Sequence, residues 1–345
     1  MIRIVLIIMI NRMIRTKAHL ETAVTFRLPN LLPTPVWAAI HTPFLPSLEL
    51  DEAGLRHNAR RYIEIGLRGV FCNGLMGEVW SLSLEERKRV VEVLCDEADG
   101  KLGVSVVVTG ASIGETLDLG LHAKAAGVDH AVLMVPTSGP RSAEQQLEYF
   151  RFICERLDMP IVLFNAATAA GSALSPASFT EVCELPQIKL LKTTAYSENP
   201  ALRAAARNGV VVSDPLEEHY FQNRLEHGQP ILYADPEPYL YQVPGHLPIA
   251  DYIAKLDAGA DAAQVIRDFE ALSHLRPLFN KWVMDPLIRG HMPNAALKYW
   301  CELIGMAGGP VRTPIRPLSD AQKRELEADL LLSNAPGLRA ALPLN

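Results

Sequence analysis

The sequence predicts an α/β protein, a (β/α)8 barrel that is followed by a C-terminal helical extension. Short apolar, β-branched runs alternate with amphipathic stretches from Pro35 onward, which is typical of parallel strands joined by helices. There are eight such runs, the number that a closed barrel of this kind needs. A doubly wound sheet is the competing fold, but no G-x-G-x-x-G follows the first run, so that fold has little support.

The strands and helix ends can be placed in order along the chain. The expected strands cover residues 36–42, 69–73, 103–109, 130–135, 161–165, 188–192, 209–213 and 231–234. Ser83, Ser112 and Ser142 each precede a Glu or Gln by three residues, which predicts a capping box at the start of a helix. Glycines stand where four of the helices should end, at Gly66, Gly100, Gly127 and Gly228.

The chain divides into four expected parts. Residues 1–33 form a poorly ordered extension or precede a true start further along, because the apolar run 4–10 is too short to span a bilayer and lacks a cleavage site. The barrel covers residues 34–260, and a helical appendage covers residues 261–335. The appendage packs on the barrel or forms an oligomer contact, and residues 336–345 are a tail.

Composition excludes several classes of protein. The net charge is −6 with no basic stripe, so nucleic acid is not an expected partner. The five cysteines have no C-x-x-C spacing, which predicts reduced thiols of a cytoplasmic protein and neither disulfides nor a metal site. Apolar residues make up 49% of the chain, which is enough for a sizeable core.

Lys192 is the first candidate for chemistry, since active sites of β/α barrels lie at the C-terminal ends of the strands. It ends the strand 188–192 and shares one face with Ile188 and Leu190. If that face is the barrel interior, burial without an adjacent carboxylate leaves the amine uncharged and able to attack a carbonyl carbon. Alternatively, the side chain reaches past the strand end to water. The residues alone leave both interpretations open.

Several motifs resemble a known family. They are "HTPF" (41–44), "GLMGEVWSLSLEER" (74–87), "VP" (135–136), "FNAATAAG" (164–171), "LLKTT" (190–194) and "ALKYWCELIG…VRTPIRPLS" (296–319). In their order and spacing they are similar to the N-acetylneuraminate lyase and dihydrodipicolinate synthase family of class I aldolases, over roughly residues 35–331. The resemblance implies a homotetrameric TIM barrel that binds a small 2-oxo acid.

The family's chemistry carries over to Lys192. By the resemblance, this lysine condenses with the keto group of pyruvate or another 2-oxo acid, which then undergoes aldol cleavage, condensation or dehydration, in some cases with an aldehyde. The iminium acts as the electron sink, so no metal or organic cofactor is expected.

The chain departs from the family at the positions that supply hydroxyl groups and charge. Phe164 stands where the family has a tyrosine that moves protons, and Leu75 and Met76 replace two threonines. Thr137 and Ser138 replace a tyrosine pair, and Ala169 replaces an arginine. These changes predict a non-standard proton relay and argue against dihydrodipicolinate synthase activity itself. The apolar residues favour a substrate with a hydrophobic or aromatic arm, or they fill a cavity that no ligand uses.

Other strand ends supply the remaining candidates. We expect the turn with Gly74 and Gly77 to offer backbone N–H groups to a carboxylate, and Glu78 and Asn165 to brace loops. Thr194 could bond the substrate. The candidates for a replacement acid or base are His41, Asp214 and Tyr233.

Three functions follow. The first is a Schiff-base-forming lyase acting on a 2-oxo acid, with Lys192 as nucleophile. The alternative is a non-catalytic keto-acid-binding barrel of the same family. A weaker third hypothesis is a hydrolase that works from the Asp214–His219 cluster.

Overall fold

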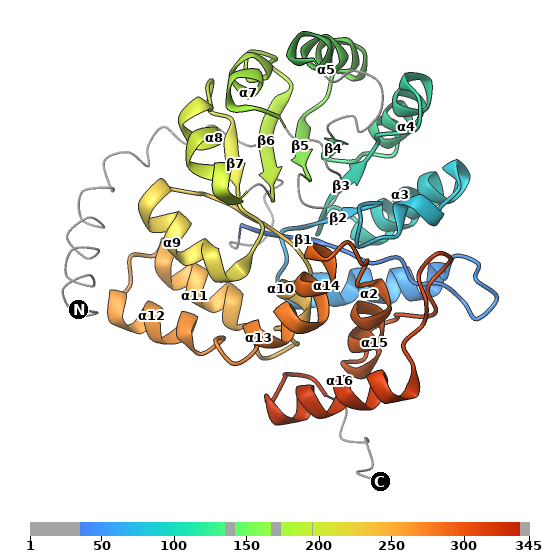
Figure 1. The fold of residues 1–345 in the computed structure, drawn as a ribbon, viewed down its shortest axis with the longest axis vertical. Coiled ribbons are helices and arrows are strands. Elements are labelled where there is room, and N and C mark those ends of the chain that lie inside the picture. The colour runs from blue at the N-terminus through green and yellow to red at the C-terminus, as the bar shows by residue number, and fades with distance from the viewer. Residues whose placement is uncertain (1–34, 135–141, 167–173, 195, 339–345) are drawn as a thin grey trace.

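Eight parallel strands form a single sheet that curls into a barrel (Figure 1). The computed structural model describes residues 35–134, 142–166, 174–194 and 196–338. Its strands are β1 (Val36–Ala39), β2 (Gly69–Cys72), β3 (Gly103–Val107), β4 (His130–Met134), β5 (Ile161–Asn165), β6 (Ile188–Thr193), β7 (Val211–Ser213) and β8 (Leu232–Ala234). Each lies within or next to an expected run, so the predicted fold class is confirmed.

The strands follow the order β7-β6-β5-β4-β3-β2-β1-β8, so β7 and β8 stand at the two ends of the hydrogen-bonded sheet. A side chain links these two strands. The Ser213 hydroxyl donates to the carbonyl of Ile231 at 3.3 Å and accepts from the N–H of Tyr233 at 3.2 Å. The barrel is therefore nearly closed.

The end of the barrel where the strands begin is filled by aromatic rings. Trp37 is fully buried and stacks on Tyr233, with ring centroids 5.7 Å apart. Gly69 and Gly103 make room for it, because a Cβ atom at these positions would lie only 2.4 and 2.5 Å from the Trp37 ring. Since this end is packed solid, a binding site within the barrel must lie at the opposite end, at the C-terminal ends of the strands.

Helices cover the outside of the barrel (Figure 1). They are α2 (Glu52–Glu64), α3 (Leu84–Ala98), α4 (Ile113–Ala125), α5 (Ala143–Leu157), α7 (Pro176–Val182), α8 (Asn199–Ala205), α9 (Glu217–His227), α10 (Glu237–Leu240) and α11 (Pro248–Asp257). Ser83, Ser112 and Ser142 are N-caps as predicted, but the full reciprocal capping box forms only at Ser83. At the start of α4, the Glu115 carboxylate accepts instead from the N–H of Ala111.

The C-terminal segment is helical and returns to the barrel. It contains α12 (Ala262–Glu270), α13 (Arg276–Phe279), the π-helical turn η4 (Asn280–Met284), α14 (Asp285–Ile288), α15 (Asn294–Leu303) and α16 (Asp320–Leu332). In Figure 1 these orange and red helices lie along the side of the barrel that carries α2 and α11. Asn58 of α2 binds both the N–H and the carbonyl of Ala307, each at 2.8 Å.

Some predictions fall outside the described residues. They concern the extension 1–33, the "VP" motif with Thr137 and Ser138, and Ala169. In the part that the structure describes, the five cysteines are free, as predicted, and no helix is long and apolar enough to cross a membrane.

Candidate active site

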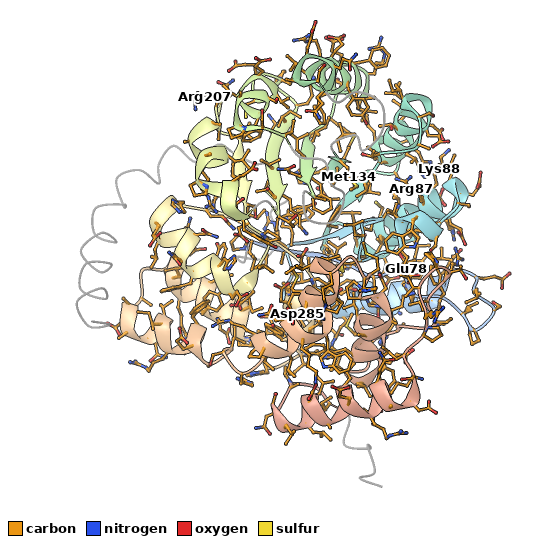
Figure 2. The ribbon with its side chains drawn as sticks, in the orientation of Figure 1. Glu78, Arg87, Lys88, Met134, Arg207 and Asp285 are labelled. Carbon is orange, nitrogen blue, oxygen red and sulfur yellow. The ribbon has the colours of Figure 1, made fainter. Side chains whose placement is uncertain are left out.

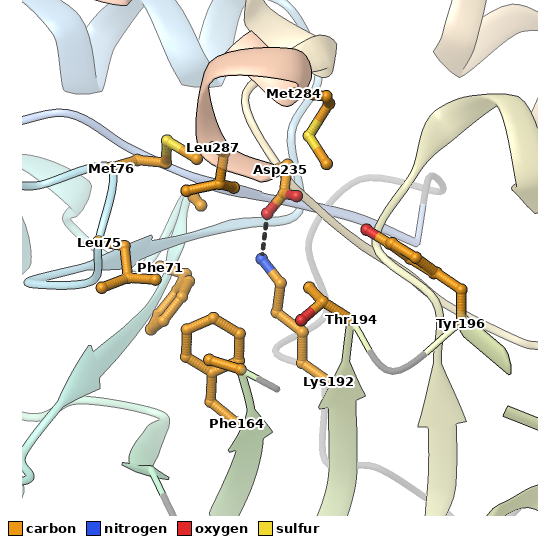
Figure 3. Close-up of a pocket in the computed structure, with 12 residues that line it drawn as sticks. Phe71, Leu75, Met76, Phe164, Lys192, Thr194, Tyr196, Asp235, Met284 and Leu287 are labelled. Carbon is orange, nitrogen blue, oxygen red and sulfur yellow. Dashed lines mark hydrogen bonds and ion pairs between the residues drawn. The ribbon is translucent and has the colours of Figure 1, made fainter. Parts of the chain in front are cut away.

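A pocket opens at the C-terminal ends of the strands (Figure 3). It encloses about 460 Å³ of empty space, including solvent at its mouth. The described residues that line it are Ala39, Phe71, Leu75, Met76, Phe164, Ala166, Lys192, Thr194, Tyr196, Asp235, Met284 and Leu287. Only four of these carry a polar side-chain group, so the pocket is largely apolar, as ligand sites in proteins commonly are.

Lys192 extends from the end of β6 into this pocket and is 1% exposed. Its Nζ donates to Asp235 Oδ1 at 2.7 Å and to the carbonyl of Ala234 at 3.2 Å. Snorkelling to water is therefore wrong, and so is the expectation of an amine without an adjacent carboxylate. Asp235 follows β8 directly, and its N–H bonds to the carbonyl of Pro215 at 3.3 Å. The carboxylate thus reaches Lys192 across the barrel mouth.

Aromatic rings surround the same nitrogen. The ring centroids of Phe71, Phe164 and Tyr233 lie 5.2, 5.3 and 5.9 Å from Lys192 Nζ. Ring faces attract a cation, and the Asp235 carboxylate does the same, whereas burial opposes the charged form of an amine. An amine is a nucleophile only without its proton, and Asp235 is the proton acceptor in contact with it.

The turn that follows β2 forms one wall of the pocket through the side chains of Leu75 and Met76. Within this turn the N–H groups of Gly77 and Glu78 bond to the carbonyls of Gly74 and Leu75, at 3.0 and 3.2 Å. The N–H groups of Leu75 and Met76 have no hydrogen-bond partner within the described part of the chain.

This turn is held from outside by the C-terminal segment. Glu78 is fully buried and its carboxylate contacts Lys298 Nζ of α15 at 2.5 Å. It also accepts from the N–H of Arg312 at 3.0 Å, and Asn294 donates to the carbonyl of Met76 at 2.9 Å. In Figure 2, Glu78 lies between the α3 side of the barrel and the C-terminal helices. Glu78 therefore braces the loop and lies outside the pocket lining.

Asn165 and Thr194 occupy neighbouring strand ends. The Asn165 amide donates to the hydroxyl of Thr193 at 3.3 Å and accepts from the N–H of Leu174 at 3.1 Å. Asn165 thus ties β5 to β6 and does not line the pocket. Thr194 does line the pocket and is 8% exposed.

Two of the candidate acids and bases lie away from the pocket lining. His41 is fully buried and its Nε2 lies 2.7 Å from the carbonyl of Ala307. Burial lowers the pKa of His41 to about 4, partly offset by this backbone hydrogen bond. Asp214 accepts from Asn199 and pairs with His219, at 3.1 Å in both cases. Both residues are engaged in packing the barrel.

Tyr233 lies beneath the pocket. Its hydroxyl is buried, and burial raises the pKa of the phenol. The ring contributes to the aromatic surroundings of Lys192.

Seven lining residues were not among the predicted site residues, namely Ala39, Phe71, Ala166, Tyr196, Asp235, Met284 and Leu287. Asp235 and Tyr196 follow strands eight and six closely, so the rule that selected Lys192 could have found them. Phe71 belongs to a predicted strand, but nothing in its pattern marks it. Met284 and Leu287 come from η4 and α14 of the C-terminal segment, and no strand-based rule could have placed them here.

Comparison with known proteins agrees with this architecture. A model of the dihydrodipicolinate synthetase family matches residues 33–228. A 4-hydroxy-tetrahydrodipicolinate synthase of Methanothrix thermoacetophila is 31% identical over 299 residues, which cover 84% of this chain and 94% of that protein. An N-acetylneuraminate lyase of Escherichia coli is 33% identical over 161 residues, which cover 46% of this chain and 54% of that protein.

A solved structure supports the same fold. The N-acetylneuraminate lyase of Proteus mirabilis matches with a TM-score of 0.71 at 21% identity, and the match covers 88% of this chain and 99% of that chain. The family model and the Methanothrix relative together span most of the barrel and beyond. The chain therefore belongs to the dihydrodipicolinate synthetase family, as the order of its motifs predicted.

Proposed function

We propose that this protein is a lyase that forms a Schiff base between Lys192 and pyruvate or another 2-oxo acid. The observation that carries the proposal is the position of the Lys192 amine, which is buried in a largely apolar pocket with a carboxylate 2.7 Å away. Membership of the family supports a lyase. The finer assignment to Lys192 rests on the geometry.

The pair formed by Lys192 and Asp235 suggests how the amine is activated. Asp235 accepts a proton from the ammonium, and the neutral amine attacks the keto carbon to give a carbinolamine. Loss of water from the carbinolamine gives an iminium. This cation occupies the place of the ammonium, so the three aromatic rings stabilise it as well.

The turn after β2 supplies a site for the substrate carboxylate. The N–H groups of Leu75 and Met76, which have no partner among the described residues, could bind it in place of the family's threonine hydroxyls, and Thr194 can add a hydroxyl. No arginine lies among the described lining residues, so backbone groups must do most of the recognition.

The remaining lining favours a substrate with an apolar arm. Leu75, Met76 and Phe164 are joined by Met284 and Leu287 from the C-terminal segment. A polyhydroxylated arm would lose its hydrogen bonds to water against these side chains without replacement, at a cost of about 1–3 kcal/mol for each buried group. We infer a 2-oxo acid with a hydrophobic or aromatic substituent, in a cytoplasmic homo-oligomer.

Trapping tests the proposal. Incubation with pyruvate and sodium borohydride should add a reduced three-carbon adduct to Lys192, detected by peptide mass spectrometry. Lys192→Ala should remove the adduct. Lys189→Ala is the matched control, since Lys189 lies on the same strand but contacts the carbonyl of Pro186 at the surface. Absence of any adduct with 2-oxo acids would refute the proposal.

A second candidate is a non-catalytic barrel that binds a keto acid. The phenyl ring at Phe164 favours it, because a phenyl ring cannot move protons. An adduct without turnover of any 4-hydroxy-2-oxo acid, or reversible pyruvate binding without an adduct, would support this candidate. Sedimentation would test the expected tetramer.

A further inference from the structure

Tyr196 is a pocket residue to which the proposed function has given no role. It begins the short 3-10 turn η3 (Tyr196–Glu198), four residues after Lys192, and its side chain lines the pocket. Figure 3 shows its ring across the pocket from Leu75 and Met76, with the hydroxyl pointing toward the side where Lys192 meets Asp235. The phenol therefore faces the space in which a substrate bound to Lys192 would lie.

The Tyr196 hydroxyl has no structural task that the described residues reveal. Its oxygen is buried and has no hydrogen-bond partner within the described part of the chain. A buried hydroxyl without a partner costs stability, and Tyr196 lines the pocket, where a ligand can supply the missing partner. The position points to the substrate as the missing partner.

The ring of Tyr196, in contrast, is held firmly. It packs edge-on against the imidazole of His219, with centroids 5.7 Å apart and planes at 81°. His219 in turn pairs with Asp214 at 3.1 Å, and Asn199 donates to the same carboxylate. The Asp214–His219 cluster, which the sequence suggested as a hydrolase site, thus supports the ring of Tyr196.

Burial and the surrounding negative charge keep the Tyr196 phenol protonated. Burial raises the pKa of the phenol, and the nearby carboxylates of Asp235, Asp214, Glu237 and Glu218 raise it further. The group is a neutral proton donor at physiological pH. Once deprotonated beside a cationic iminium, it is a strong base.

We propose that Tyr196 is the catalytic acid and base of this site, and that it replaces the hydroxyl which Phe164 cannot supply. The inference rests on the proposed Schiff base at Lys192. Among the described lining residues the other polar side chains are Lys192, Asp235 and Thr194. The first two already form the ion pair, and the Tyr196 hydroxyl lines the pocket without a partner among the described residues, so the phenol is the group suited to the relay.

Tyr196 gives up a proton in one step of this scheme and regains one in the next. When the C–O bond of the carbinolamine breaks, the nitrogen lone pair forms the C=N bond and Tyr196 gives its proton to the departing hydroxide, which leaves as water. The resulting phenolate then takes a proton from C3 of the pyruvate iminium, whose C–H electron pair forms the enamine. Tyr196 is thereby restored as a phenol. Once its O–H proton has exchanged with D2O, reversal of the second step places deuterium on C3.

Deuterium exchange tests this role without knowledge of the aldehyde partner. The full-length protein is incubated with pyruvate in D2O, and loss of the pyruvate methyl signal is followed by proton NMR. Tyr196→Phe should lower the exchange rate about 10²–10⁴-fold, the usual contribution of a general acid or base. The variant should still give the borohydride adduct on Lys192 after long incubation, because imine formation is slowed but remains possible.

Tyr220→Phe is the matched control. Tyr220 also has a buried hydroxyl without a partner among the described residues, but it lies on α9 outside the pocket lining, and its loss should leave exchange unchanged. Exchange by Tyr196→Phe within about threefold of the wild-type rate, with the adduct intact, would overturn the role of Tyr196 alone. A wild-type protein that gives no adduct would overturn the proposed function and this inference together.

Discussion

Asp235→Asn is the perturbation that probes the site most directly. The Asp235 and Lys192 side chains are 7% and 1% exposed and their charged atoms lie 2.7 Å apart. At an effective dielectric constant near 20, the attraction across such a distance is about 6 kcal/mol, most of which offsets the desolvation of two buried ions. Removal of one partner leaves the other uncompensated, which costs about 3–5 kcal/mol.

A double-mutant cycle isolates this pair from other effects of the substitutions. Asp235→Asn and Lys192→Met should each lower the free energy of unfolding, measured by urea denaturation, by about 3–5 kcal/mol. The double variant carries neither charge, so it should lie within about 2 kcal/mol of the wild-type protein, a coupling well above the roughly 0.5 kcal/mol scatter of independent sites. Additive losses in the double variant would refute the description of a tightly coupled buried pair.

The partly exposed pair of Arg224 and Asp257 supplies a control for the cycle. Its atoms lie at the same distance of 2.7 Å, but the side chains are 15% and 33% exposed. Asp257→Asn should therefore cost less than about 1 kcal/mol. A similar loss of unfolding free energy for Asp235→Asn and Asp257→Asn would show that burial of the ion pair does not determine its contribution to stability.

Three further predictions concern the rest of the barrel. Gly69→Ala places a Cβ atom 2.4 Å from the Trp37 ring and should lower the urea unfolding free energy by about 1–3 kcal/mol. Glu78→Gln breaks the buried contact with Lys298 and loosens the turn after β2, so the concentration of pyruvate needed for half-maximal trapping should rise. Burial lowers the pKa of His41 to about 4, so the unfolded chain binds a proton at this histidine at a higher pH than the folded protein does. As the pH is lowered from 6.5 to 4, the free energy of unfolding should therefore fall by about 1.4 kcal/mol per pH unit. The His41→Gln variant should show a smaller slope.

The fold could be predicted because local patterns determine it. The eight apolar runs, each followed by an amphipathic stretch, leave a parallel barrel as the simplest arrangement, and each strand appears within about three residues of its expected bounds. Period-two alternation also put Lys192 on the same face of its strand as Ile188 and Leu190, although it left open whether that face is the interior of the barrel. These features depend on residues that are close in sequence.

The partner of Lys192 could not be predicted in the same way. Asp235 lies 43 residues further along the chain, and β6 and β8 are not hydrogen-bonded neighbours in the sheet. Their ends meet only because the sheet curls, which brings strand ends together across the mouth. The contributions of Met284 and Leu287 depend in addition on how the C-terminal segment returns to the barrel. Contacts of this kind follow from tertiary structure and leave no local signal.

The energetics of the buried pair bear on its purpose. A buried ion pair is a poor way to stabilise a fold, since well-packed apolar residues of the same volume are often as good or better. The pocket around Lys192 is already lined by apolar side chains, so a leucine or methionine there would extend an existing surface. A lysine and an aspartate at this place are instead what imine chemistry needs, a nucleophile with a proton acceptor in contact. The proposed reaction with a carbonyl compound therefore explains the pair better than stability of the barrel does. Urea denaturation and borohydride trapping of the Lys192 and Asp235 variants should distinguish these two explanations.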